Sequence, residues 1–240
     1  MIRFAVETMP AVASTNDLVA EHAREGAAEG LVIRAEAQTS GRGRQGRHWE
    51  SPRGNLYASL LLRPQRRLHE AASLSLVVAL SLAEALTRLP PPAYLAPGLK
   101  WPNDVRLSGA KIAGILLENA GADATNPAII AGLGVNVAVA PKGMPYAVTS
   151  LRAAGAETTP EMVLDLFLAA FATNYAEWQA GGFAVLRARW LDRAEGLGEP
   201  VELKRGEETI AGRFVDVDPA GHLVLETEGG TKTLPAGEML

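Results

Sequence analysis

The amino-acid sequence predicts an α+β fold in which a mixed sheet forms the main core and a small β-barrel follows it. Up to residue 195, apolar segments of strand and helix length succeed one another without the strict alternation of a doubly wound parallel sheet. Beyond residue 196, short alternating strands are separated by polar turns, which is typical of a small barrel. We therefore expect two domains, 1–195 and 196–240.

The individual elements are predicted from apolar runs bounded by glycine, proline and polar residues. In the larger domain, strands are predicted over Ile2–Glu7, Gly30–Glu36, Asn55–Arg63, Leu99–Trp101, Val105–Leu107, Lys111–Leu117 and Ala128–Val139. Helices are predicted after Ser14, whose hydroxyl would cap the first turn, and over His69–Leu89, Thr159–Gly181 and Phe183–Ala194. Barrel strands are predicted over Val201–Lys204, Thr209–Val217, His222–Glu226 and Thr231–Leu234.

Composition narrows the class of protein. The chain has 240 residues, of which 48% are hydrophobic, enough for a sizeable core. It contains no cysteine, which excludes disulfides, thiolate metal sites and cysteine nucleophiles. A net charge of −4 disfavours nucleic acid as a partner. No signal-peptide pattern and no apolar run of about 20 residues is present, so we expect a cytoplasmic protein without membrane attachment.

A polar, glycine-rich stretch, Gln38–Gly54, is the most informative segment, and its central part, Gly41–Arg47, is called here the Gly/Arg loop. Three glycines in this loop allow the backbone to present N–H groups to a ligand. Three arginines carry guanidinium groups that can donate paired hydrogen bonds to carboxylate and phosphate oxygens. A solvated basic loop, or a segment that contacts RNA weakly, explains the same residues equally well.

Two further segments carry charge at strand ends. The sequence Lys100–Asp104 (KWPND) places Asn103 and Asp104 at the tip of a turn, although an ordinary Asx turn explains it too. Lys111 stands at the mouth of an otherwise apolar strand, where an ammonium is costly unless it meets an anion. The alternative is a lysine that extends from the strand end to water.

Two weaker motifs complete the set. Asn136 follows closely spaced glycines in Gly132–Val137, where the backbone can approach a ligand or merely pack tightly. Ser14–Asn16 can be a simple helix cap. Other chemistries are excluded: the four histidines lack metal-ligand spacing, and neither a GxSxG elbow, a Walker A loop nor a Rossmann fingerprint is present.

Taken in order, these motifs resemble the biotin–protein ligase family. The resemblance is dense from residue 14 to 151 and continues loosely from Gly212 to Gly237, where that family carries an SH3-like barrel. It rests on STN (Ser14–Asn16), AEAQTSGRGRQGRHW (Ala35–Trp49), SPRGNLYASLLL (Ser51–Leu62), KWPNDV (Lys100–Val105), GAKIAGILLE (Gly109–Glu118), GLGVNV (Gly132–Val137) and VTSL (Val148–Leu151). It implies the biotin ligase, class II synthetase-like fold.

The resemblance also implies a reaction: biotin and ATP form biotinyl-AMP, and a lysine of a biotin carboxyl carrier protein takes the biotinyl group. Mg²⁺ is expected with ATP, and no protein ligand for a metal is assigned. By motif position, the catalytic residues would be Lys111, Arg42, Arg44 and Asp104. Biotin would contact Ser14, Thr15, Asn16, Gln38, Gly41, Arg42, Arg44, Lys111 and Gly114. ATP would contact Arg44, Trp49, Asn103, Lys111 and Asn136.

Two rival functions remain open: a lipoate–protein ligase of the same fold, and a non-catalytic module that binds biotin or nucleic acid. Too few residues precede Ser14 for the DNA-binding domain that some family members carry, so we expect no operator-binding role. The family also makes a sheet-edge homodimer a reasonable expectation. The Gly/Arg loop is predicted to close over biotinyl-AMP and keep water from it.

Overall fold

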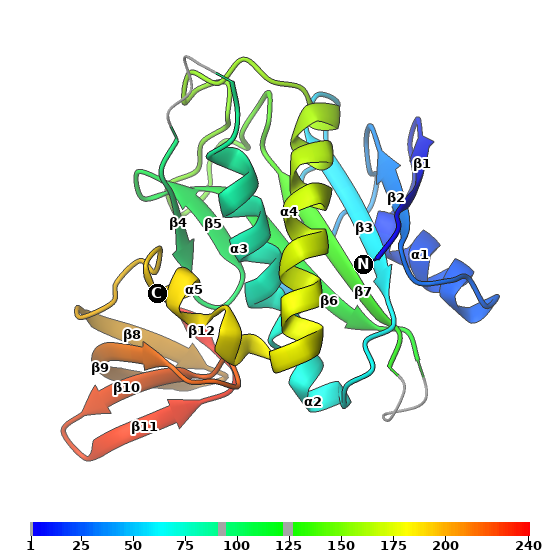
Figure 1. The fold of residues 1–240 in the computed structure, drawn as a ribbon. Coiled ribbons are helices and arrows are strands. Elements are labelled where there is room, and N and C mark those ends of the chain that lie inside the picture. The colour runs from blue at the N-terminus through cyan, green and yellow to red at the C-terminus, as the bar shows by residue number, and fades with distance from the viewer. Residues whose placement is uncertain (1, 91–94, 122–126) are drawn as a thin grey trace.

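The computed structural model describes residues 2–90, 95–121 and 127–240, and a seven-stranded mixed sheet forms its centre (Figure 1). The strand order is β1-β2-β3-β7-β6-β5-β4. Only the β1–β2 pair is parallel among the pairs of this sheet, which confirms the predicted mixed sheet. The strands are β1 (Ala5–Met9), β2 (Leu31–Ala35), β3 (Leu56–Leu62), β4 (Pro97–Lys100), β5 (Asp104–Leu107), β6 (Ala110–Asn119) and β7 (Ile129–Val135).

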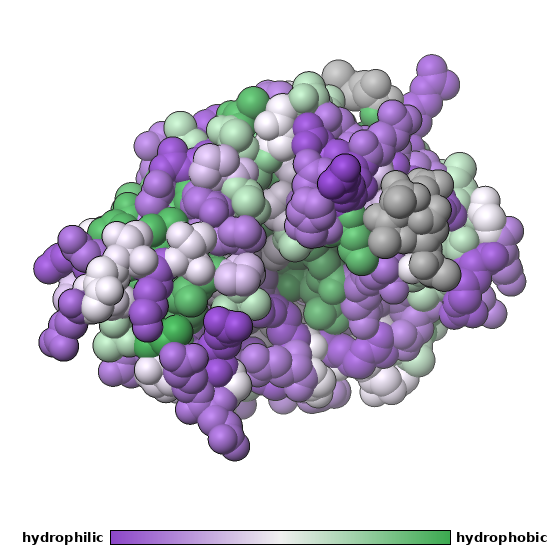
Figure 2. Space-filling model, turned by 90° about the horizontal axis from the view of Figure 1, so that it is seen from below, coloured by the Kyte–Doolittle hydropathy of each residue, from purple (hydrophilic) through white to green (hydrophobic). Residues whose placement is uncertain are grey.

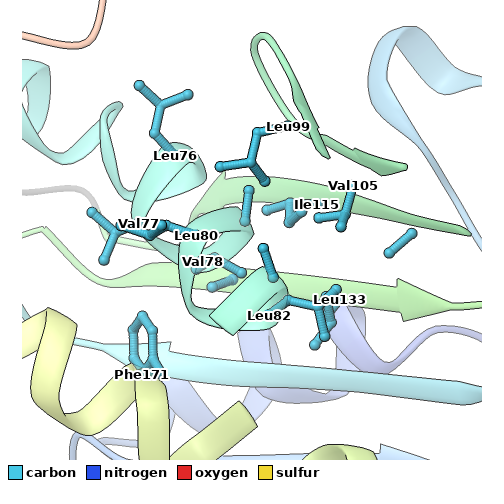
Figure 3. Close-up of a cluster of buried hydrophobic side chains, with 14 of the residues drawn as sticks. Leu76, Val77, Val78, Leu80, Leu82, Leu99, Val105, Ile115, Leu133 and Phe171 are labelled. Carbon is cyan, nitrogen blue, oxygen red and sulfur yellow. The ribbon is translucent and has the colours of Figure 1, made fainter. Parts of the chain in front are cut away.

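Helices cover both faces of this sheet. Helices α3 (Leu74–Leu86) and α4 (Pro160–Gly181) lie side by side across one face (Figure 1). Helix α1 (Thr15–Arg24) packs on the other face. Successive residues of a strand point to opposite faces of the sheet, so each central strand contributes to both cores. Thus Leu60 of β3 joins the α3–α4 core and Leu61 joins the α1 core. Figure 3 shows the larger core, with side chains from α3 and α4 packed onto sheet residues Leu99, Val105, Ile115 and Leu133.

On the face of the sheet that α1 covers, the strand residues next to the start of α1 are serine and glycine and no longer apolar. Ser59 of β3 lies opposite Gly132 of β7, and Gly134 of β7 lies opposite Gly114 of β6. Because these glycines have no side chains, they leave a hollow on the sheet, and side chains from neighbouring segments occupy it. A Cβ on Gly132 would lie 2.3 Å from Asn16 Oδ1, and one on Gly134 would lie 2.6 Å from the Trp49 indole. These two glycines therefore provide the space that seats Asn16 and Trp49.

The C-terminal residues form the predicted barrel, an antiparallel sheet in the order β11-β10-β9-β8-β12. It packs against the preceding part of the chain: Trp101 Nε1, in the turn after β4, donates to the Gly221 carbonyl at 3.1 Å, and Arg187 forms an ion pair with Asp216. Its strands are β8 (Pro200–Arg205), β9 (Glu208–Val217), β10 (Leu223–Thr227), β11 (Gly230–Leu234) and β12 (Glu238–Met239).

Helix continuity is where the sequence prediction is wrong. The predicted helix His69–Leu89 is two helices, α2 (Leu68–Ala71) and α3. The break falls at Ser73, whose hydroxyl donates to the Glu70 carbonyl and accepts from Trp178 Nε1. Helix α3 also ends before Leu89.

The predicted helix Phe183–Ala194 is likewise divided, into a 3₁₀ turn, Phe183–Val185, and α5 (Arg187–Leu191). It stops early because the Arg193 carbonyl accepts from Leu99 N at the edge of the sheet. The predicted caps had different outcomes. Thr159 accepts from Met162 N as expected, whereas the Ser14 side chain makes no cap hydrogen bond.

The surface view in Figure 2 shows a mostly hydrophilic face with hydrophobic residues exposed around a central hollow. Among the described residues, one helical stretch, Leu68–Leu86, passes a length-and-composition test for a membrane span. Since 67% of its apolar window is buried inside the protein, it has the character of a core helix.

Candidate active site

A cavity of about 340 Å³ opens on the α1 face, between the Gly/Arg loop, strands β4–β7 and the end of β12. Most of the predicted site residues line it: Ser14, Thr15, Asn16, Gln38, Arg42, Arg44, Trp49, Asn103, Asp104, Lys111 and Gly114. Asn136 instead lines a second cavity of about 220 Å³, which shares Trp49, Lys111 and Tyr146 with the first. The Asn136 side chain donates to the Thr149 carbonyl at 3.1 Å.

Gly41 is absent from the residues that line either cavity. A Cβ at this position would lie 2.5 Å from the Trp49 carbonyl oxygen, so a glycine is needed for close packing of the loop base. A contact between Gly41 and biotin remains a prediction.

Gln38 and Thr15 are hydrogen-bonded to each other where they line the cavity. Thr15 N donates to Gln38 Oε1 at 2.8 Å, and Thr15 Oγ1 lies 3.1 Å from the same oxygen. Gln38 Nε2 donates to Ser51 Oγ at 3.0 Å, and Ser51 donates to the Trp49 carbonyl at 2.9 Å. The Gln38 amide therefore has one defined orientation.

Ser59 and Glu118 extend this network, and the sequence analysis assigned neither a role. Ser59 is 0% exposed, and its Oγ lies 2.7 Å from Thr15 Oγ1 and 2.5 Å from Asn16 Oδ1. Asn16 Nδ2 donates to Glu118 Oε2 at 2.5 Å. The available signal was a serine within an otherwise apolar strand, since a buried hydroxyl requires a partner.

Arg42 is held by two carboxylates. Its guanidinium donates to both Asp17 oxygens, at 2.7 and 2.6 Å, and more weakly to Glu118 Oε1 at 3.4 Å. The hydrogen bond from Arg42 lowers the pKa of Asp17, and the same bond raises the pKa of Arg42. The predicted contact between Arg42 and the acyl-phosphate region would require exchange of these partners.

Arg44 crosses the cavity to reach both the KWPND turn and the barrel. It donates to Asn103 Oδ1 and to the Gly237 carbonyl, each at 3.2 Å, and burial lowers its pKa. Asn103 Nδ2 donates to the Ile115 carbonyl at 2.9 Å, so both ends of this amide serve other segments. Nearby, Arg47 forms an ion pair with Glu238 at 2.6 Å.

Lys111 points into the cavity and does not extend to solvent. Its side chain is 16% exposed, and Nζ lies 2.7 Å from Asp104 Oδ1. The ammonium also lies 5.6 Å from the Trp49 ring centre and 5.7 Å from that of Tyr146, within cation–π range. This arrangement favours an anion-binding role for Lys111, because its ammonium group lies where the two cavities meet.

Lys100 is a cavity cation that the sequence analysis did not single out. It lines the cavity beside Asp104, its partner in the β4–β5 pair, and burial lowers its pKa. Within the described residues, Lys100 has no carboxylate within ion-pair distance.

Tyr146, also unassigned from sequence, has a pKa raised by burial. In the same described part, no cluster of three histidine or acidic side chains is placed to bind a metal.

Comparison with known families places these features in one class. The family described as "Biotin/lipoate A/B protein ligase family" matches residues 8–136, and "Biotin protein ligase C terminal domain" matches residues 196–240. The chain belongs to the biotin/lipoate protein ligase family.

Individual relatives agree. A biotin–[acetyl-CoA-carboxylase] ligase of Paracoccus denitrificans is 42% identical over 214 residues, covering 86% of this chain and 88% of the relative. The bifunctional ligase/repressor BirA of Escherichia coli is 31% identical, covering 98% of this chain and 73% of the relative. The Aquifex aeolicus biotin protein ligase, solved with biotin and ATP, superposes with a TM-score of 0.81 at 31% identity, covering 98% and 97%.

Proposed function

We propose that this protein is an ATP-dependent biotin–protein ligase that biotinylates a lysine of a biotin carboxyl carrier protein. The observation that carries the proposal is one cavity with two different ends. A neutral hydrogen-bonding end, with Thr15 and Gln38, suits a polar ring, and a cationic end, with Arg44 and Lys111, suits carboxylate and phosphate. The relatives named as biotin–[acetyl-CoA-carboxylase] ligases support biotin over lipoate.

In the first step, a biotin carboxylate oxygen bonds to the α-phosphorus of ATP, and the bond to pyrophosphate breaks. Negative charge builds on the phosphoryl oxygens as this occurs. Lys111 and Arg44 would stabilise that charge, since preorganised cations act most strongly in a site with little water. Trp49 and Asn103 would border the nucleotide, as would Asn136 from the second cavity.

In the second step, the carrier lysine amine attacks the mixed-anhydride carbonyl, an amide bond forms, and AMP leaves. Asp104 would orient the amine or take its proton. Because Asp104 Oδ1 lies 2.7 Å from Lys111 Nζ, the two steps would share one ion pair. Closure of the Gly/Arg loop would protect the anhydride between the steps.

Several finer expectations belong to the same proposal. Mg²⁺ would enter as MgATP. The catalytic unit would comprise residues 1–195 and the barrel 196–240, and the enzyme would work in the cytoplasm without nucleic acid as a partner. Strand β1 lies at an edge of the seven-stranded sheet, which would suit pairing with a second copy in a homodimer.

Pyrophosphate exchange into ATP tests the first step, with biotin, lipoate or no acid added. We expect exchange with biotin only, followed by biotinylation of a purified carrier domain detected with streptavidin. Exchange with lipoate alone would establish the lipoate ligase instead. Biotin binding without exchange would establish a non-catalytic module. A DNA mobility shift at physiological ionic strength would contradict the expected lack of a nucleic-acid partner.

A further inference from the structure

The side chain of Asn55, the residue before β3, continues the contact between β3 and β7 beyond the end of their ladder. Its Oδ1 accepts hydrogen bonds from three consecutive backbone N–H groups, those of Val137, Ala138 and Val139, at 2.9, 2.9 and 3.1 Å. Its Nδ2 donates to the Val139 carbonyl at 2.9 Å. Because three donors converge on one atom, that atom is the amide oxygen and the orientation of the amide is fixed.

This contact meets a need that arises where β7 ends. Backbone N–H groups that leave a sheet lose their ladder partners and require other acceptors. Asn55 is 2% exposed, so its own amide also requires partners from the protein. One buried side chain therefore satisfies three successive N–H groups and sets the path of the chain after β7.

The chain from 137 to 152, called here the 137–152 segment, leaves the sheet and returns beside its own start. Arg152 N donates to the Val137 carbonyl at 2.9 Å, which joins the returning arm to the outgoing arm. The position of the returning arm therefore depends on the outgoing arm, which Asn55 holds.

The returning arm takes the place of β7 beside β6. Lys111 N donates to the Ala147 carbonyl at 2.9 Å, and Thr149 N donates to the Lys111 carbonyl at 3.0 Å. Asn55 itself is absent from the residues that line either cavity. Between the two arms, side chains of the segment line the second cavity: Pro141, Met144, Tyr146 and Val148.

We propose that Asn55 is a positioning residue for the nucleotide, because it fixes the 137–152 segment as a wall of the second cavity before ATP binds. The inference rests on the proposed function, in which ATP borders this cavity. A segment that is already held loses little conformational freedom when its ligand arrives, whereas a loose segment must be ordered at the cost of affinity. Thr15 and Gln38 line only the first cavity, so biotin affinity does not depend on Asn55.

The test compares Asn55→Ala with the wild type, as full-length proteins, in pyrophosphate exchange and in calorimetric titration with biotin. We expect the KM for ATP to rise about tenfold, the effect of one lost buried hydrogen bond, and the Kd for biotin to stay unchanged. Asn55→Asp keeps an oxygen that accepts from the three N–H groups, so its KM should lie between those of the wild type and Asn55→Ala. An equal rise in both constants, or an Asn55→Asp protein as impaired as Asn55→Ala, would overturn the proposal.

Asn174→Ala is the matched control, since it truncates another buried asparagine. Asn174 is 1% exposed, and its Nδ2 donates to Ser81 Oγ at 3.0 Å and to Glu84 Oε2 at 2.8 Å, between α3 and α4 on the face of the sheet away from α1. This variant should lower the melting temperature, as Asn55→Ala should, and leave the KM for ATP unchanged. A rise in KM as large as that of Asn55→Ala would assign the effect to lost stability and overturn the proposal.

Amide hydrogen exchange tests the anchor in the wild type without any variant. The amides of Val137 and Val139 should be as protected as those of β7, although they lie beyond its end, because Asn55 accepts from both. Rapid exchange at both amides in the ligand-free protein would overturn the proposal.

The outcomes also separate this inference from the proposed function. If the wild type shows no biotin-dependent pyrophosphate exchange, the proposed function fails. If the wild type is active and Asn55→Ala has the wild-type KM for ATP, only the role of Asn55 fails.

Discussion

The two ends of the cavity are built by opposite means. At the ring end, buried neutral side chains hydrogen-bond to one another, with Glu118 as the single charged partner: Thr15, Asn16 and Ser59 are all at most 5% exposed. At the charged end, cations are held by carboxylates, either from a distant segment, as in Arg47–Glu238, or from the adjacent strand, as in Lys111–Asp104. The ring end is thus complete before substrate arrives, whereas the charged end holds internal anions where phosphate is expected.

This difference has an energetic consequence. A buried polar group that loses its partner costs about 1–3 kcal/mol, so the ring end resists rearrangement. An exposed ion pair such as Arg47–Glu238, whose side chains are 47% and 31% exposed, contributes about 0–1 kcal/mol, so its partners exchange readily. We therefore expect changes at the ring end to alter which acid binds, and changes at the charged end to alter rates and loop behaviour.

The largest expected effect follows from Lys111→Ala, which removes the central cation of the charged end. Pyrophosphate exchange should fall about 100- to 1,000-fold, the usual effect of losing one preorganised group that stabilises transition-state charge. The Kd for biotin should rise far less, because the ring contacts remain. Lys204→Ala, on the exposed barrel strand β8, is the control and should exchange normally. Equal losses in rate and affinity would contradict the separation of the two ends.

A second test compares two glycines of β7. Gly132→Ala places a methyl group 2.3 Å from Asn16 Oδ1, so it should displace Asn16 and raise the Kd for biotin about tenfold or more. Gly134→Ala places one 2.6 Å from the Trp49 indole, so it should alter tryptophan fluorescence and the KM for ATP. Calorimetry and steady-state kinetics separate the two effects. An identical loss for both variants would show general disruption of the sheet.

How far the sequence predicts this site depends on which end is considered. The strands, the barrel and the cavity residues Thr15, Gln38, Arg44 and Lys111 follow from periodicity and motif order. The Asp17–Arg42 and Asn16–Glu118 contacts do not, because no local pattern pairs a helix residue with a loop 25 residues on or with a strand 102 residues on. The break at Ser73 was missed for the same reason, since Trp178 supplies its partner from another helix.

A smaller effect is expected from Lys100→Met. The methionine keeps the length of the side chain and removes a half-buried cation whose pKa is lowered by burial. The KM for ATP should rise about tenfold, as expected when one charge-assisted contact to phosphate is lost, and the Kd for biotin should not change. The melting temperature of the ligand-free protein should stay the same or rise, because a desolvated charge is removed. A fall in melting temperature together with an unchanged KM would assign Lys100 to the fold.

The smallest effect concerns the Arg42–Asp17 pair and its dependence on pH. Arg42 holds the pKa of Asp17 below its ordinary value of 3.8, so this pair stabilises the folded protein above about pH 4. The stabilisation is lost as pH falls through the lowered value. Because the Asp17 side chain is 54% exposed, the difference in melting temperature between wild type and Asp17→Asn should be small at pH 7 and shrink further as the pH falls below the lowered pKa of Asp17.

The same variant decides what Arg42 does at neutral pH. If the pair latches the Gly/Arg loop, Asp17→Asn and Arg42→Ala should both speed the loss of biotinyl-AMP a few-fold, measured by trapping the released adenylate. If Arg42 acts by contacting the acyl phosphate, only Arg42→Ala should do so, because Asp17→Asn leaves that guanidinium free to reach its ligand. Glu36→Gln, which opens another exposed pair, should retain the adenylate as the wild type does. A loop that kept the adenylate in all three variants would remove Arg42 from the charged end, and closure would then depend on Arg44 and Arg47.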